Sequence, residues 1–223
     1  MRWLKDPTGH HHSRVPRAYR ILRRFFRSLV TVWFREINIV DDENLPPEGG
    51  IIFIAWHPSG LIDPMLMNAS LPGRVSIIAK HTLFKLPLVG RLLRAAGGVP
   101  IERAQDSGDQ AAASARNSKL LSGASSVVAK GGRLMIFPEG TTHTGSEVKR
   151  VRSGAGRILL AARRQAQKEG FAEPQLVPIG LHYSNSQRFR ERAAVMIERS
   201  MVFDSIPEEV DDEVVQDQLD RAW

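Results

Sequence analysis

The chain alternates short apolar runs with segments whose apolar residues recur at helical spacing. Runs of four to eight apolar residues next to Gly or Pro are typical of buried strands, and longer periodic segments are typical of helices. On this basis we expect strands near residues 50–56, 74–79, 99–101, 133–137, 175–182 and 193–200. We expect helices or helical turns near residues 62–70, 83–96, 109–130 and 154–168. This alternation predicts an α/β fold with a mixed, largely parallel sheet covered by helices.

An N-terminal arm, residues 14–36, has a different pattern. Its apolar residues recur at helical steps, namely Leu22, Phe26, Leu29 and Trp33. Arginines recur on the opposite side at Arg17, Arg20, Arg24 and Arg27. A basic amphipathic helix with few acidic residues favours a membrane interface with anionic lipid. The alternative is a helix docked on the protein body with a solvated basic face.

Composition and charge limit the possible classes of protein. With 223 residues and 42% hydrophobic content, the chain can bury the core of one domain. It has no cysteine, which excludes disulfides, thiol nucleophiles and thiolate metal sites. The formal net charge of +7 implies an anionic partner: a membrane surface, a phosphorylated substrate or nucleic acid. No run of about 20 apolar residues predicts a membrane-spanning helix, and no secretory signal is evident.

The charge is unevenly distributed and suggests four regions. Residues 1–13 form a start that we expect to be flexible, followed by the basic arm at 14–36. A body at 37–203 carries the strands and helices of the α/β fold, and residues 204–223 form an acidic tail. The tail ends without a helix stop signal, so the chain could be a fragment of a longer protein.

The most informative motif is the segment His57-Pro58-Ser59-Gly60-Leu61-Ile62-Asp63, which follows the apolar run 51–56. Pro58 fixes φ and Gly60 permits a tight turn, so the Asp63 carboxylate can return to the His57 imidazole. A carboxylate on one ring nitrogen leaves the other nitrogen free to accept a proton from a hydroxyl, as a general base does. The alternative is a structural histidine at a strand end and an ordinary helix cap at Asp63.

Three further segments occur in a fixed order after this motif. Residues 97–103 contain a Gly-Gly turn and end at Arg103, and Phe137-Pro138-Glu139-Gly140-Thr141 follows a short apolar strand. The fourth, Val177-Pro178-Ile179, lies in the strand expected at 175–182. Together with residues 57–63, these segments resemble the four sequence blocks of the glycerolipid acyltransferase family. This PlsC-like family includes the lysophosphatidic acid and glycerol-3-phosphate acyltransferases.

The resemblance runs from about residue 51 to residue 183 and has two departures. Five residues separate His57 from Asp63, where the usual family pattern has four. Thr142 stands where most members have an arginine, so part of the expected phosphate contact comes from elsewhere or is absent.

The resemblance implies a membrane-associated O-acyltransferase of phospholipid synthesis. Such an enzyme moves a fatty acyl group from acyl-CoA or acyl carrier protein to the hydroxyl of lysophosphatidic acid or glycerol 3-phosphate. His57 would be the base and Asp63 its orienting partner. The substrate-binding residues implied are Arg103, Glu139, Gly140, Thr141 and Arg152. No metal or cofactor is implied, and the enzyme is expected to be peripheral, on the cytoplasmic face of a membrane.

Other functions remain possible from the sequence. A non-catalytic lipid-binding module could keep the acyltransferase fold and the basic arm. A hydrolase with Ser59 as nucleophile is disfavoured because Ser59 lacks the Gly-x-Ser-x-Gly pattern. Nucleic-acid binding is also disfavoured, because the arginines of the arm accompany a continuous apolar face rather than spaced aromatic residues.

Overall fold

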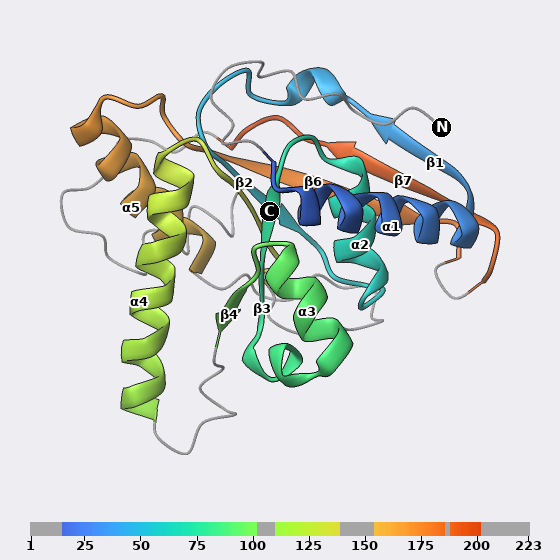
Figure 1. Ribbon diagram of the computed structural model, residues 1–223. Helices are drawn as coiled ribbons and strands as arrows, with labels where there is room; N and C mark the ends of the chain where they lie inside the picture. The colour runs from blue at the N-terminus through green and yellow to red at the C-terminus, as the bar shows by residue number, and fades with distance from the viewer. Residues whose placement is uncertain (1–14, 102–109, 139–153, 186–187, 202–223) are drawn as a thin grey trace.

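The computed structural model describes residues 15–101, 110–138, 154–185 and 188–201, and shows a seven-stranded sheet with helices on both faces (Figure 1). The strands are β1 (Phe34–Val40), β2 (Ile51–Ala55), β3 (Val75–Lys80), β4 (Val99–Ile101), β5 (Arg133–Ile136), β6 (Gln175–Tyr183) and β7 (Glu191–Ile197). The α-helices are α1 (Arg17–Trp33), α2 (Ile62–Ser70), α3 (Pro87–Ala95), α4 (Gln110–Ala129) and α5 (Gly154–Glu169). Two short 3-10 helices are η1 (Asp42–Asn44) and η2 (His81–Lys85).

The strands lie in the order β1-β7-β6-β2-β5-β3-β4. Five neighbouring strands, from β6 to β4, run parallel, whereas β7 runs antiparallel to β6. Strand β1 pairs parallel with β7 at one edge of the sheet. The expected mixed, largely parallel sheet is therefore confirmed, and the carboxyl ends of the five parallel strands meet at one edge.

Alternating residues of the central strand β2 belong to two separate hydrophobic cores. Phe53 joins a core under α1 and α2, whereas Ile52 and Ile54 join a core under α4 and α5. All five residues of β2 are buried, because side chains alternate between faces and both faces are covered by helices. This three-layer packing holds β2 rigidly. Because the histidine motif closely follows β2, the same packing fixes the position where that motif begins.

Most predicted elements agree with the structure to within a few residues. The principal element that the sequence analysis missed is β1, which crosses the boundary placed between the arm and the body at residue 36. The helix of the arm ends at Trp33, and Phe34 begins an edge strand directly. The arm therefore continues into the sheet of the body.

The structure corrects the faces assigned to helix α1. Leu22 is buried and Phe26 packs against the core formed with α2, so neither residue faces outward. Arg27 does not belong to a solvated basic face, because its Nε donates a 3.0 Å hydrogen bond to the Ala69 carbonyl of α2. The helix is docked on the body through Leu22 and Phe26, because packing against α2 outweighs the exposed orientation that periodicity suggested for these two residues. Leu29 and Trp33 of the same predicted face stay exposed.

Helix α3 ends in a turn that starts the next strand. Gly97 adopts φ 73°, and the amide of Gly98 donates to the Leu93 carbonyl at 2.7 Å. These are features of a Schellman helix end, which requires a left-handed residue that glycine supplies at little cost. None of the helices in the described ranges combines the length and the apolar content of a membrane span.

Candidate active site

The site is built at the carboxyl end of β2, where the chain leaves the sheet and turns into α2. Gly60 adopts φ 60°, a left-handed conformation that is favourable for glycine, and α2 begins two residues later at Ile62. The turn returns Asp63 to His57, and His57 Nδ1 lies 2.8 Å from Asp63 Oδ2. The expected contact between these two residues is therefore confirmed.

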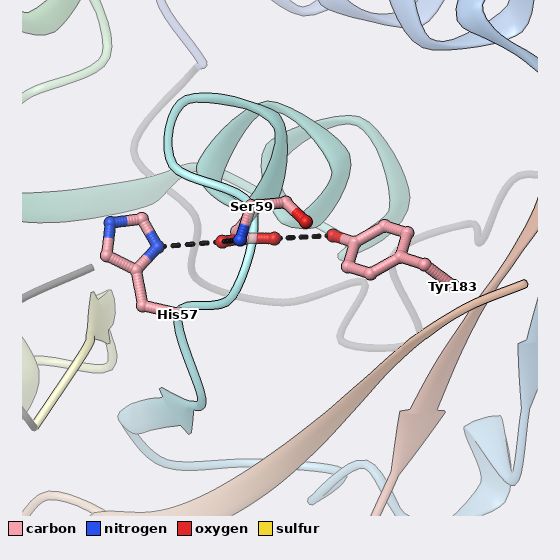
Figure 2. Close-up of polar contacts among 4 residues, drawn as sticks. His57, Ser59 and Tyr183 are labelled. Atoms are coloured by element: carbon pink, nitrogen blue, oxygen red, sulfur yellow. Dashed lines mark hydrogen bonds and ion pairs between the residues drawn. The ribbon is translucent and has the colours of Figure 1, made fainter. Parts of the chain in front are cut away.

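Asp63 is fully buried and accepts three hydrogen bonds (Figure 2). The backbone amide of Ser59 donates to Oδ2 at 2.7 Å, and the Tyr183 hydroxyl donates to Oδ1 at 2.6 Å. Together with the Nδ1–H of His57, these donors compensate the carboxylate for its loss of water. The buried charge thus has a partner on each oxygen.

Tyr183 is the last residue of β6 and comes from far along the chain. Its ring stacks on Phe34, the first residue of β1, with centroids 5.7 Å apart. Burial raises the pKa of the Tyr183 hydroxyl, and the charge of Asp63 and the hydrogen bond to it act in the same direction. At neutral pH the hydroxyl is therefore protonated and acts as a donor.

The second ring nitrogen of the imidazole points away from Asp63 (Figure 2). His57 Nε2 has no hydrogen-bond partner among the residues for which the structure gives positions. With Asp63 ionised, Nδ1 carries the proton and Nε2 is the basic nitrogen. The side chain of His57 is 18% exposed, so a bound molecule can reach it.

A pocket of about 560 Å³ lies beside His57. Its lining is mostly apolar and comes from several elements at the same sheet edge, including Ile77, Leu83, Leu93 and Leu121. Pockets of this size and character hold apolar ligands of small-molecule size. The pocket therefore offers a place for an apolar ligand beside the imidazole of His57.

A second depression, of about 900 Å³, is lined by residues that include Asn44, Trp56, Pro178 and Met201. Neither His57 nor Asp63 contributes to its lining. We therefore assign the candidate site to the smaller pocket, because His57 lines that pocket.

Residues 36–182 match the Acyltransferase family model, and this range contains His57, Asp63 and Phe137. The chain belongs to the Acyltransferase family. The identification agrees with the resemblance inferred from the order of the four sequence blocks.

Two curated proteins and one solved structure resemble this chain. A 1-acyl-sn-glycerol-3-phosphate acyltransferase of Borreliella burgdorferi is 26% identical over 133 residues, which cover 59% of this chain and 50% of that protein. An uncharacterised acyltransferase of Schizosaccharomyces pombe is 24% identical over 248 residues, which cover 75% of this chain and 36% of that protein. The match thus spans half or less of the length of each curated relative.

The crystal structure of the 1-acyl-sn-glycerophosphate acyltransferase PlsC from Thermotoga maritima superposes with a TM-score of 0.61 at 19% sequence identity. The alignment covers 92% of this chain and 76% of that chain. At this identity the similarity establishes a common fold.

Several predicted site residues lie outside the described residues. These are Arg103, Glu139, Gly140, Thr141 and Arg152. The elements that lead to them are described, since β4 ends at Ile101, β5 ends at Ile136 and α5 begins at Gly154. The roles given to these residues stay predictions. Within the described ranges, no group of three or more His, Asp or Glu side chains could hold a metal ion.

Ser59 is not arranged as a nucleophile for His57. Its backbone amide binds Asp63, and its hydroxyl lies on the Tyr183 side of the carboxylate, away from the imidazole (Figure 2). Its Oγ is buried without a hydrogen-bond partner. This geometry removes the basis for a serine hydrolase.

Two residues of the site received no role in the sequence analysis. Tyr183 donates to Asp63. In the sequence, only its position at the end of an apolar strand could have indicated a role in the site. Phe137 follows β5 and was noted as part of a motif, but its ring stacks on His57 with centroids 4.1 Å apart and planes inclined by 20°. Both contacts join residues that are distant in sequence.

Proposed function

We propose that this protein transfers a fatty acyl group from a thioester to the hydroxyl of 1-acylglycerol 3-phosphate. The observation that carries the proposal is the imidazole of His57, which lines an apolar pocket and whose Nε2 has no hydrogen-bond partner in the described part of a chain of the Acyltransferase family. The pocket has the character that an acyl chain requires, and the histidine has the partner that a general base requires.

The proposed reaction needs one base and no covalent enzyme intermediate. His57 Nε2 takes the proton from the acceptor hydroxyl as its oxygen attacks the thioester carbonyl carbon. The tetrahedral intermediate then expels the thiolate, the C–S bond breaks, and the imidazolium returns the proton to sulfur. Asp63 stabilises the imidazolium between these two steps, because its negative charge lies 2.8 Å from Nδ1.

The acceptor is proposed from the name of the Borreliella burgdorferi relative, with glycerol 3-phosphate as the second choice. Either acceptor carries a phosphate, and an arginine can bind phosphate oxygens with two parallel hydrogen bonds. We expect Arg103 and Arg152 to supply such donors and amides near Gly140 to stabilise the oxyanion. The donor is an acyl-CoA or an acyl carrier protein thioester.

A product assay with the full chain tests this proposal. The protein is offered mixed acyl-CoAs with glycerol 3-phosphate, lysophosphatidic acid or lysophosphatidylcholine, and products are identified by mass spectrometry. We expect phosphatidic acid from lysophosphatidic acid, and no product with His57→Ala. His182→Ala is the matched control, because His182 is an exposed histidine on β6. Normal turnover by folded His57→Ala would contradict the mechanism.

We also propose that helix α1 associates with anionic bilayers, through a face that shares Leu29 with the expected one but excludes Leu22 and Phe26. An apolar stripe on α1 remains exposed and consists of Ile21, Phe25, Leu29 and Val32. Its exposed fractions reach 67% at Ile21 and 60% at Val32. Three exposed arginines, Arg17, Arg20 and Arg24, lie along one border of the stripe. Apolar insertion combined with basic side chains at the same surface is the pattern of an interfacial helix.

Vesicle co-sedimentation separates this proposal from its alternatives. Phe25→Asp with Val32→Asp should release the protein from vesicles containing phosphatidylglycerol, and high salt should weaken binding of the unaltered protein. Val127→Asp is the control, because Val127 is 50% exposed on α4, over the opposite face of the sheet. Vesicle binding that depends on neither lipid charge nor the double substitution would contradict the role of α1 in membrane association. A dimer lost on the same substitution would assign the stripe to a second copy instead.

A further inference from the structure

The Asp63 carboxylate is held from two sides by groups that lie far apart in the sequence. Oδ2 accepts from His57 and from the Ser59 amide, both on the same turn, whereas Oδ1 accepts from Tyr183, 120 positions away. We propose that Tyr183 is a positioning residue for acyl transfer: its hydroxyl holds Asp63 so that Oδ2 faces His57 and controls how tightly His57 binds its proton. This inference rests on the proposed function of the same site.

The argument begins with the burial of the carboxylate. Asp63 has no exposed surface, so water cannot take the place of a missing donor without a rearrangement of the site. The 2.6 Å bond from Tyr183 is short, as expected for a neutral hydroxyl that donates to a charged oxygen. Removing that hydroxyl leaves Oδ1 without its donor. The carboxylate is then less stabilised and attracts the proton of His57 more strongly.

Tyr183 is itself held firmly in place. It stacks on Phe34 with ring planes inclined by 21°, and it pairs with Ala193 where β6 and β7 run antiparallel. Phe34 is fully buried and directly follows α1. The rigid sheet, rather than the flexible end of a loop, therefore sets the position of the hydroxyl.

The charged groups around α2 do not replace Tyr183. Among the described residues, His57 and Tyr183 are the titratable side chains in hydrogen-bond contact with the carboxylate. Arg23 and Arg27, on the helix packed against α2, donate to carbonyls at its C-terminal end and just beyond it. Lys80 lines the pocket beside His57. The substitution of Tyr183 by phenylalanine thus removes one donor and keeps the stacked ring.

Histidine ring ¹⁵N NMR on the full chain provides a test independent of activity. His57→Ala identifies the His57 signals. In Tyr183→Phe we expect the titration midpoint of His57 to rise by about half a pH unit or more, because the less compensated carboxylate attracts the ring proton more strongly. Tyr19→Phe is the matched control, since Tyr19 is also buried but its hydroxyl contacts Asn68 and Val75. It should leave the midpoint unchanged.

The kinetic readout should agree with the NMR result. Tyr183→Phe should lower kcat roughly tenfold at neutral pH with little change in KM, and the acid limb of the pH profile should move to higher pH. An unchanged or lower His57 midpoint in the folded variant would overturn the positioning role. If the unaltered protein transfers no acyl group while the midpoint rises as expected, the proposed function fails and the role of Tyr183 in holding the carboxylate stands.

Discussion

The imidazole of His57 stacks on the ring of Phe137, with centroids 4.1 Å apart and planes inclined by 20°. Asp63 fixes one edge of the imidazole through Nδ1, and Phe137 fixes its plane. A hydrogen bond alone leaves the ring free to tilt about the Nδ1 contact. The two contacts together fix the orientation of the imidazole, which lines the apolar pocket.

Phe137→Ala should therefore lower kcat more than it weakens substrate binding. Aromatic stacking of this kind contributes about 0.5–1.5 kcal/mol, so we expect a decrease in kcat of roughly threefold to tenfold. Steady-state kinetics measure the effect, and Phe171→Ala, at an exposed phenylalanine after α5, is the control. An unchanged kcat would show that stacking does not orient the base.

Asp63→Asn should keep the fold and nearly abolish turnover. The amide oxygen can still accept from the Ser59 amide, but the charge that stabilises the imidazolium is lost. We expect kcat to fall by about 10²–10⁴, with the acid limb of the pH profile moving to lower pH. Thermal unfolding checks that the fold is kept, and pH-dependent kinetics measure kcat and the acid limb. Full activity in a folded variant would show that the contact between Asp63 and His57 is structural and does not support catalysis.

The chain has two tyrosines, Tyr19 and Tyr183, and burial raises the pKa of each above 10.0. In the folded protein both hydroxyls should stay protonated where tyrosines of the unfolded chain ionise. The folded state then binds more protons, so the free energy of unfolding should fall as the pH rises above about 10. Ultraviolet titration should detect tyrosinate only as the protein unfolds, and gradual ionisation of the folded protein would refute this.

Two glycine substitutions should have opposite effects on stability. A Cβ at Gly50 would lie 1.9 Å from the Val128 carbonyl oxygen, whereas a Cβ at Gly123, within α4, would meet nothing within 4 Å. Gly123→Ala should stabilise the protein by about 0.5–1 kcal/mol, because alanine favours the helix. Gly50→Ala should destabilise it by about 1–3 kcal/mol. Denaturant unfolding of both variants checks the contrast, and equal stabilities would contradict this description of the packing.

The sequence determined most helices and strands, because each has a local cause. The apolar run of β2 and the Pro and Gly of the following turn lie within a few residues of one another, so their effect on the backbone is readable in order. The same locality made the contact between His57 and Asp63 predictable, since one turn separates them. The order of the four blocks was sufficient to indicate the family.

Tertiary structure decided what depends on contacts between distant segments. Periodicity identified α1 as amphipathic but not which face docks, because packing against α2 buries Leu22 and leaves Ile21 exposed. Tyr183 reaches Asp63, and Phe137 reaches His57, because parallel strands end at one edge of the sheet. The local sequence pattern indicates the conformation of a segment. The packing of the whole chain determines which residue each buried polar or aromatic side chain contacts.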